Sequence, residues 1–151
     1  MEQIPAQAGK TFEAVIYKLY EAFDSPFESQ KKAGKATFND AGLGKLVDSL
    51  LPSIKSFKQR RDKTIIGTMK TTLRERWQEV IEELQRTGLP SMHLLTIDDD
   101  ISANKAEQMA KHNVIVVVRK DVKQQEHLLD KRNIISFEDY FTTEIPTILN
   151  Y

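Results

Sequence analysis

Apolar residues recur along the chain at spacings that predict four helices. Residues 7–23 place an apolar side chain every three or four positions, which is typical of an amphipathic helix. Residues 72–88 repeat this spacing and end in a Gly-Leu-Pro sequence, which is a helix stop signal. Residues 101–113 predict a third helix, and a shorter fourth helix is expected around residues 136–141.

Uninterrupted apolar or β-branched runs predict four strands. Residues 45–52 form a short apolar run closed by a proline, and residues 64–69 are β-branched and apolar. Residues 92–97 predict a third strand. The fourth, residues 114–118, has no polar position at all, which is typical of a strand buried on both faces.

The connections between these runs decide the expected topology. Residues 25–44 are rich in Gly, Ser and Lys and predict a loop with at most a short strand, whereas residues 53–63 lack helical periodicity and predict a polar connection. The first two strands should therefore pair antiparallel, and the strand-helix-strand unit of residues 92–118 should form a parallel crossover. The predicted fold class is α/β: a small mixed β-sheet flanked by helices, in a single domain spanning residues 1–151.

Composition narrows the class of protein. The chain has no cysteine, which excludes a disulfide framework and a thiolate metal site, and no apolar run approaches the roughly 20 residues that span a bilayer. Its first residues lack the features of a signal peptide. We therefore expect a cytoplasmic protein with no membrane association.

Charge is unevenly distributed along the chain. The formal net charge is zero, but residues 45–76 contain nine Lys and Arg against three Asp and Glu, a local charge of +6. Such a basic block suits a polyanion such as double-stranded DNA. The alternative is an ordinary solvated charged face.

Two other groups of polar residues carry no clear metal site. His93, His112 and His127 lack the spacing of metal ligands and are expected on the surface or in loops. The acidic run of residues 98–100 could hold a cation, but the stronger expectation is that one of these carboxylates caps the following helix.

Asp48 and Lys70 form the candidate catalytic pair. Asp48 interrupts an apolar strand, and Lys70 follows the next strand, so antiparallel pairing would bring them to one end of the sheet. A carboxylate there can bind Mg²⁺, which activates a water and stabilises a phosphorane-like transition state. The lysine would orient the water or neutralise the phosphate. This pairing is the core of a metal-dependent phosphodiesterase.

A second acid is needed, and the position where it usually lies, Thr68, cannot ionise. Glu83 is a substitute, because it lies two helical turns after Arg76 and therefore on the same helix face, with Glu79 also on that face. Glu13, on the first helix, is a further candidate.

These residues resemble the PD-(D/E)xK restriction endonucleases, in particular the EcoRII-like catalytic domain and its relatives that cut CCGG, CCNGG or CCWGG sites. The family's early "GKSFE" segment is matched by residues 9–13, "GKTFE", and its aspartate strand by Leu46-Val47-Asp48. Lys70 follows 22 residues after Asp48 and Glu83 follows 13 residues after Lys70, which reproduces both family gaps. The segments "TTLRERW", "LLTIDDDIS" and "IISFEDYF" also resemble family segments, so the likeness extends over nearly the whole chain from residue 9.

The resemblance implies a restriction-endonuclease-like fold and a Mg²⁺-dependent type II restriction endonuclease that cuts duplex DNA at a CC/GG-containing site. It implies Asp48 and Glu83 as metal-binding carboxylates and Lys70 as the catalytic lysine, with Glu13 as an auxiliary acid. In this branch of the family the second acid moves to the helix, which accounts for Thr68.

Arg74, Glu75 and Arg76 are the candidates for reading DNA bases. Guanidinium groups can pair with guanine O6 and N7, and a glutamate can accept from cytosine N4. Family resemblance implies this role at the start of the helix in the major groove; a salt-bridged solvated turn is the alternative. Trp77 is expected in the core.

Two other functions stay open at this point: a repair or structure-specific nuclease with the same fold, and a DNA-binding module without catalysis. Full-length relatives also carry an additional N-terminal region. The chain is accordingly a minimal enzyme, a separate catalytic domain or a degenerate remnant. Double-strand cleavage normally uses two active sites, so a homodimer and a monomer that nicks one strand or cuts the strands in turn are both open.

Overall fold

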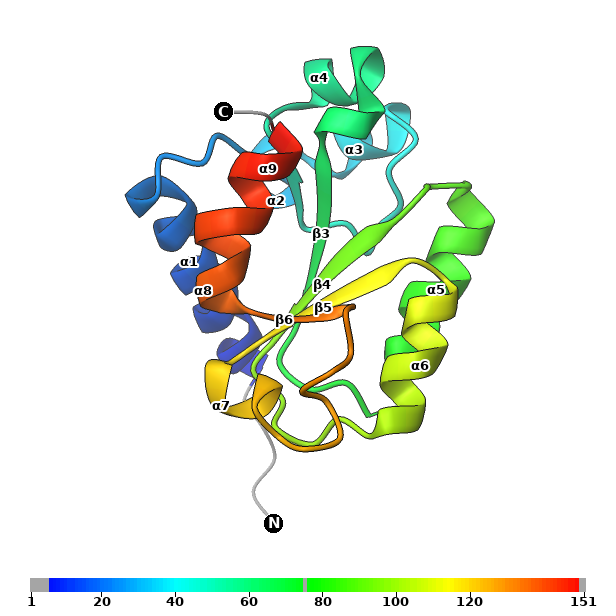
Figure 1. The fold of residues 1–151 in the computed structure, drawn as a ribbon. Helices are drawn as coiled ribbons and strands as arrows, with labels where there is room; N and C mark the ends of the chain where they lie inside the picture. Colours follow the sequence, from blue (N-terminus) through cyan, green and yellow to red (C-terminus); the bar gives the residue numbers. More distant parts are fainter. Residues whose placement is uncertain (1–5, 75, 150–151) are drawn as a thin grey trace.

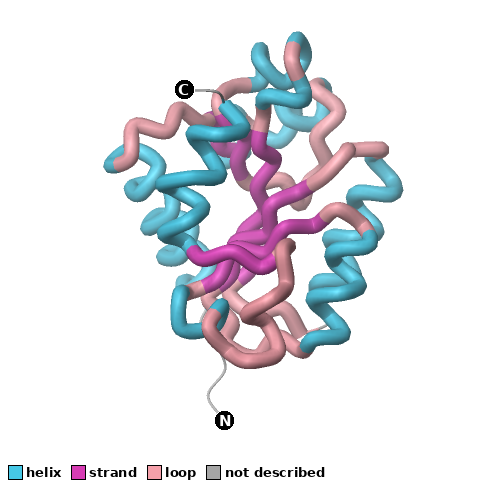
Figure 2. The backbone as a smooth tube through the Cα atoms, viewed as in Figure 1, coloured by secondary structure: helices cyan, strands magenta, loops and turns pink. Residues whose placement is uncertain are grey.

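A mixed six-stranded sheet forms the centre of the computed structural model, which describes residues 6–74 and 76–149. The strands follow one another in chain order, β1-β2-β3-β4-β5-β6, with helices on both faces (Figures 1 and 2). The predicted α/β fold class is confirmed.

The first three strands pair antiparallel, and the pairing of the second with the third confirms the prediction for residues 45–52 and 64–69. They are β1 (Glu28–Ser29), β2 (Ser49–Leu51) and β3 (Ile65–Lys70), and β2 pairs with β3 so that Ser49 lies opposite Gly67. The position before β2, Asp48, continues this pairing, because its backbone N–H donates to the Gly67 carbonyl at 2.8 Å. The antiparallel pair therefore holds Asp48 close to the carboxyl end of β3.

The connections in this half of the chain contain short helices. The prediction that residues 25–44 are mainly loop, and that residues 53–63 form a connection without helix, was therefore wrong. Residues 25–44 contain α2 (Gln30–Ala33) and α3 (Lys35–Asp40), and the next connection contains α4 (Ile54–Gln59) and a 3₁₀ turn (Arg61–Lys63). These helices are too short to show periodicity. Serine caps and single buried aromatic residues fix them instead: Ser29 caps α2, Ser53 caps α4, and α3 and α4 bury Phe38 and Phe57.

The second half of the sheet is parallel. Strand β3 pairs with β4 (Met92–Thr96), β4 with β5 (Val114–Val118), and β5 with β6 (Ile134–Ser136), all in parallel. Helix α5 (Arg76–Thr87) connects β3 to β4, and α6 (Ala103–Lys111) connects β4 to β5. The predicted parallel crossover is confirmed; α7 (Lys120–Lys123) follows β5.

Two layers of helix cover the sheet and enclose two apolar clusters. Figure 1 shows α5 and α6 on one face, and α1 (Ala6–Ala22) with the C-terminal helices on the other. The C-terminal segment consists of α8 (Phe137–Asp139), a π-helical segment (Tyr140–Glu144) and α9 (Ile145–Leu149). Trp77 packs against the α5/α6-side cluster, as expected of a core residue, while the cluster beneath α1 contains the aromatic side chains of Phe12, Tyr20, Tyr140 and Phe141.

Helix α5 begins later than the sequence pattern predicts. Its first residue is Arg76, whereas the spacing of apolar residues had placed the start at Thr72. The backbone N–H of Leu73 donates instead to Asp98 Oδ2 at 2.8 Å, so this segment is fastened to the loop after β4. The end is as predicted: Gly88 adopts a φ of 69°, and its N–H donates to the Leu84 carbonyl.

Two polar predictions outside the site were wrong. His93 is buried in β4, where its Nε2 lies 2.8 Å from Glu144 Oε2. Ser102, and not an aspartate, caps α6. Asp98 is used by Leu73 and by the N–H of Asp100, since local backbone donors compete for its carboxylate.

The part of the chain that the structure describes contains no helix long and apolar enough to cross a membrane.

Candidate active site

Asp48 is held in place by its backbone as well as by its side chain. Besides the bond to Gly67, its carbonyl accepts a hydrogen bond from Gln30 N at 3.0 Å and a longer one from the Tyr17 hydroxyl at 3.4 Å. The first ties Asp48 to the start of α2 and the second ties it to α1. Three elements thus fix the direction in which the carboxylate leaves the chain.

The Asp48 carboxylate is oriented by strand β3. Its Oδ2 accepts a hydrogen bond from Met69 N at 2.7 Å and a longer one from Thr68 Oγ1 at 3.4 Å. Thr68 is completely buried. The residue in the position of the usual second acid therefore acts here as a hydrogen-bond donor to the first.

Burial raises the pKa of Asp48 to about 6. The Met69 N–H, Lys70 and Thr68 oppose this shift, whereas the negative charge of Glu13 reinforces it. A carboxylate that is costly to charge and lies near a second acid favours a bound cation.

Lys70 ends β3 and is itself buried, with 8% of its surface exposed. Burial lowers its pKa, and the positive charge of Arg76 lowers it further, while Asp48, Glu79 and Glu13 act in the opposite direction. An ammonium group in this environment gives up its proton more readily than a solvated lysine does.

A pocket of about 190 Å³ brings these groups together. We call it the aspartate pocket; residues Glu13, Lys45, Leu46, Asp48, Lys70 and Arg76 are among those that line it. They come from α1, the segment before β2, the end of β3 and the first residue of α5. Three of the four predicted catalytic residues, Glu13, Asp48 and Lys70, therefore share one pocket.

Glu83 lies in a neighbouring pocket of about 450 Å³, the glutamate pocket, lined by Lys45, Leu46, Glu79, Glu82, Glu83 and Arg86. Its carboxylate is buried and paired with the guanidinium of Arg86, one turn further along α5. It also covers Gly44, where a Cβ atom would overlap it. Lys45 and Leu46 line both pockets, so Glu83 and Asp48 lie in adjoining but different pockets.

The described residues include no group of three or more His, Cys, Asp or Glu side chains arranged to hold a metal. Magnesium, however, commonly takes only one or two carboxylates and keeps several waters. Asp48 Oδ1 accepts no hydrogen bond from any residue of the described ranges, so one oxygen faces no competing donor. The hard oxygen donors Asp48 and Glu13 in the aspartate pocket therefore fit a magnesium ion.

The three predicted base-reading residues lie in different surroundings. Arg74 is exposed and has a φ of 34°, an uncommon conformation for a residue with a side chain. Glu75 lies outside the described residues. Arg76 is an exposed residue at the start of α5 and also lines the aspartate pocket, so its charge acts on Lys70.

Three residues near the site carried no prediction of their own. Arg86 could have been inferred from its spacing of three after Glu83, which places both on one helix face. Gly44 and Lys45 gave no such signal, because their positions depend on how the segment before β2 crosses α5.

Known proteins match this chain over nearly its whole length. The family model described as EcoRII C terminal matches residues 2–141. The type II restriction enzyme SsoII of Shigella sonnei is 37% identical over 134 residues, which make up 89% of this chain and 44% of that protein.

Solved structures of restriction endonucleases have the same fold. Metal-depleted Ecl18kI in complex with uncleaved DNA superposes with a TM-score of 0.81 at 32% identity, covering 96% of this chain and 46% of the other. The PspGI–substrate DNA complex has a TM-score of 0.74 at 22% identity and covers 96% of this chain and 62% of the other. The chain thus spans about half the length of SsoII and Ecl18kI, and it belongs to the EcoRII C-terminal family of type II restriction endonucleases.

Proposed function

We propose that this chain is the catalytic domain of a type II restriction endonuclease that hydrolyses phosphodiester bonds of duplex DNA, with Mg²⁺, at a CC/GG-containing site. The observation that carries the proposal is the convergence of Asp48, Lys70 and Glu13 in one pocket at the carboxyl end of β3. Family membership supports it, as do the DNA complexes of Ecl18kI and PspGI.

Lys70 is the proposed catalytic lysine. Its lowered pKa lets the amine hold the attacking water and take a proton from it, and in its charged form the same group neutralises the phosphate. Glu13, which lies in the same pocket, serves as an auxiliary acid and adds negative charge beside Asp48.

Asp48 and Glu83 are the proposed ligands of the magnesium ion. When bound, Mg²⁺ would lower the pKa of a water ligand and stabilise the charge of the transition state. Asp48 Oδ1 accepts no hydrogen bond from the described residues and is available to a metal. Glu83 can bind the metal only if its ion pair with Arg86 is broken. Glu13 offers a second carboxylate without any such exchange.

Arg74, Glu75 and Arg76 are the proposed base-reading residues. The exposure of Arg74 supports contact with guanine in the major groove. Arg76 also lines the aspartate pocket, so base recognition would take place directly beside the catalytic residues Asp48 and Lys70. A homodimer would supply one active site for each strand, and the mass of the complex with the duplex should then correspond to two protein chains and one duplex.

Plasmid cleavage tests the proposal. Supercoiled plasmids that contain or lack CCGG, CCNGG and CCWGG sites are incubated with the protein, with and without Mg²⁺. We expect cleavage only with Mg²⁺ and a matching site, and a rate about 10²–10⁴-fold lower for Lys70→Ala. Lys111→Ala, an exposed lysine at the end of α6, is the matched control. The proposal fails if cleavage is absent, or if Lys70→Ala cuts as fast as the wild type.

Sequencing the ends of the products extends the same experiment to recognition. Arg74→Ala should weaken discrimination at one G·C pair by roughly 1–3 kcal/mol. Lys58→Ala, in the basic block, should weaken binding to all sequences about equally. If both variants lose affinity and keep the wild-type site preference, Arg74 does not read bases.

A DNA-binding module without catalysis is the second candidate. One observation favours it: Glu83 forms an ion pair with Arg86, and it lies in a different pocket from Asp48. This candidate predicts salt-dependent binding and no cleavage under any metal. A structure-specific nuclease would instead cut branched or mismatched DNA without regard to sequence.

A further inference from the structure

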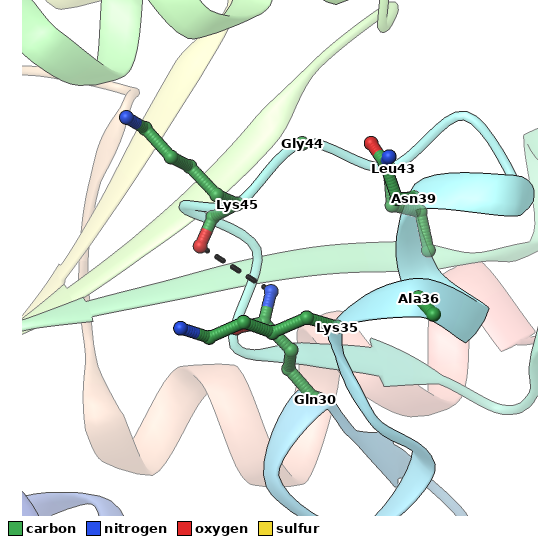
Figure 3. A pocket seen from close by; sticks show the side chains of 7 residues that line it. All are labelled: Gln30, Lys35, Ala36, Asn39, Leu43, Gly44 and Lys45. Atoms are coloured by element: carbon green, nitrogen blue, oxygen red, sulfur yellow. Dashed lines mark hydrogen bonds between the residues drawn. The ribbon is translucent and has the colours of Figure 1, made fainter.

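A third pocket opens beside the aspartate pocket and is strongly cationic. It has a volume of about 280 Å³; Gln30, Lys35, Asn39, Gly44 and Lys45 are among its lining residues (Figure 3). We call it the lysine pocket. Two of its lining side chains are ammonium groups and none is acidic, so it favours an anion.

The two lysines have no partner among the described residues. Lys35 and Lys45 are exposed, and neither ammonium group forms an ion pair or hydrogen bond there. By contrast, Lys131 pairs with Glu107, and Lys123 donates to two backbone carbonyls. Lys35 and Lys45 therefore keep their full donor capacity for a ligand.

The backbone around the lysine pocket is held by hydrogen bonds, although the ammonium groups of Lys35 and Lys45 have no described partner. The Gln30 amide donates to the carbonyls of Lys45 and Val47, at 3.3 and 3.1 Å, which anchors the segment that carries Lys45. Helix α3 places Lys35 and Asn39 four residues apart, on one face. Figure 3 shows the side chains of Lys35 and Lys45 extending toward the same side, with the Gln30 amide bonded to the Lys45 carbonyl.

Lys45 connects this pocket to the proposed chemistry. It lines the lysine pocket, the aspartate pocket and the glutamate pocket. A DNA strand carries a phosphate about every 3.4 Å along the helix axis. Because Lys45 lines the aspartate pocket together with Asp48 and Lys70, a strand with one phosphate near Asp48 and Lys70 can place a neighbouring phosphate beside Lys45.

We propose that the lysine pocket binds a backbone phosphate of the DNA strand that enters the aspartate pocket, at a position adjacent to the scissile phosphate. Lys35 and Lys45 supply the positive charge for this phosphate. This interaction sets the register of the strand without reading its sequence. The inference rests on the proposed function, since it assumes that DNA is the substrate.

The test measures binding without cleavage. Duplexes that carry a single methylphosphonate, which removes the charge of one phosphate, are titrated with protein in EDTA, and the modified position is moved across the protected site. We expect the wild type to lose affinity severalfold at a phosphate next to the cut position. The Lys35→Ala/Lys45→Ala variant should show no further loss at that phosphate, and the slope of log K against log salt should fall by about 0.9 for each phosphate that the protein no longer neutralises.

Lys111→Ala is the matched control and should keep the wild-type profile. Both substituted lysines are exposed, and circular dichroism verifies that the variant is folded. An unchanged salt slope, or a methylphosphonate profile identical to that of the wild type, overturns the inference.

Two further results separate this inference from others. If inorganic phosphate protects the wild type but not the double variant against heat, and DNA binding is the same in both, the pocket takes free phosphate and the inference is wrong. If wild-type protein binds no duplex, the proposed function itself has failed, and this inference fails with it. Binding without cleavage, in contrast, still tests the inference, because the methylphosphonate profiles of the wild type and the double variant are compared position by position.

Discussion

The aspartate pocket and the glutamate pocket are neighbours that treat a buried carboxylate in opposite ways. In the first, Asp48 accepts hydrogen bonds from β3, and no described Lys, Arg or His nitrogen pairs with it. In the second, Glu83 is neutralised by Arg86 on its own helix. Lys45 and Leu46 line both pockets.

The difference explains which carboxylate is prepared for a cation. Asp48 has a raised pKa and a free oxygen, so a divalent ion would relieve an electrostatic cost already present in the fold. Glu83 is instead paired with the guanidinium of Arg86 on its own helix. A metal that binds both carboxylates must therefore break the Glu83–Arg86 salt bridge, whereas it breaks no described salt bridge of Asp48.

Among variants that compare the two pockets, the largest effect is expected from Asp48→Asn. The folded state raises the pKa of Asp48 from 3.8 to about 6, so folding binds a proton between these values and stability falls as pH rises through them. Asparagine removes this cost, and its carbonyl oxygen can still accept from Met69 N. Without metal, the variant should be more stable than the wild type at pH 7.5, by up to about 3 kcal/mol.

Chemical denaturation between pH 4.5 and 7.5 measures this difference, which should shrink toward pH 4.5. Asp62→Asn, on the exposed 3₁₀ turn, is the matched control and should leave the pH dependence unchanged. A variant that is less stable than the wild type at pH 7.5 would show that burial of the Asp48 charge is not the dominant cost.

A smaller effect is expected from Glu83→Gln, which tests whether the two pockets cooperate. If Glu83 binds the metal, loss of its charge should raise the Mg²⁺ concentration for half-maximal cleavage by about 10–100-fold. The measurement is a Mg²⁺ titration of single-turnover cleavage. A titration that superimposes on that of the wild type would leave Asp48 and Glu13 as the metal-binding pair.

Arg86→Ala provides the complementary control. Because Arg86 competes with the metal for Glu83, its removal should lower the Mg²⁺ requirement. A raised requirement in both variants would instead mean that Arg86 holds Glu83 in its working position.

The general fold could be predicted because its long elements are periodic. The first helix, the buried strand of residues 114–118 and the parallel crossover all carry strong hydrophobic patterns, and all are present. The short helices α2, α3 and α4 could not be predicted, because serine caps and single aromatic contacts fix them. The start of α5 was predicted too early because the Leu73 N–H donates a hydrogen bond to the Asp98 carboxylate in the loop after β4. This contact is between residues distant in sequence, so hydrophobic spacing does not reveal it.

The candidate site could be predicted only in part from the sequence. Strand pairing predicted that Asp48 and Lys70 converge, and the structure places both in the aspartate pocket, together with Glu13, which was named as a further candidate on the first helix. Spacing also put Glu83 on the helix face of Arg76, but the side chain turns to Arg86 and Gly44. A side chain's choice between partners depends on the tertiary path of residues 44–46, which periodicity does not encode.

The smallest effect on stability is expected from Gly44→Ala, which acts on the boundary between the pockets. The added Cβ would meet the end of the Glu83 side chain, which is buried and paired with Arg86, so the free energy of unfolding should fall by about 1 kcal/mol. Glu83 must nevertheless leave its present position, and the methyl group displaces it away from the segment that borders Asp48. The Mg²⁺ requirement should therefore rise severalfold, in the same direction as in Glu83→Gln. In the double variant Gly44→Ala/Glu83→Gln the two effects should not add, because both act through one carboxylate. Additive effects in the Mg²⁺ titration would show that position 44 acts instead through Lys45 and the lysine pocket. They would also contradict the proposal that Asp48 and Glu83 bind the metal together.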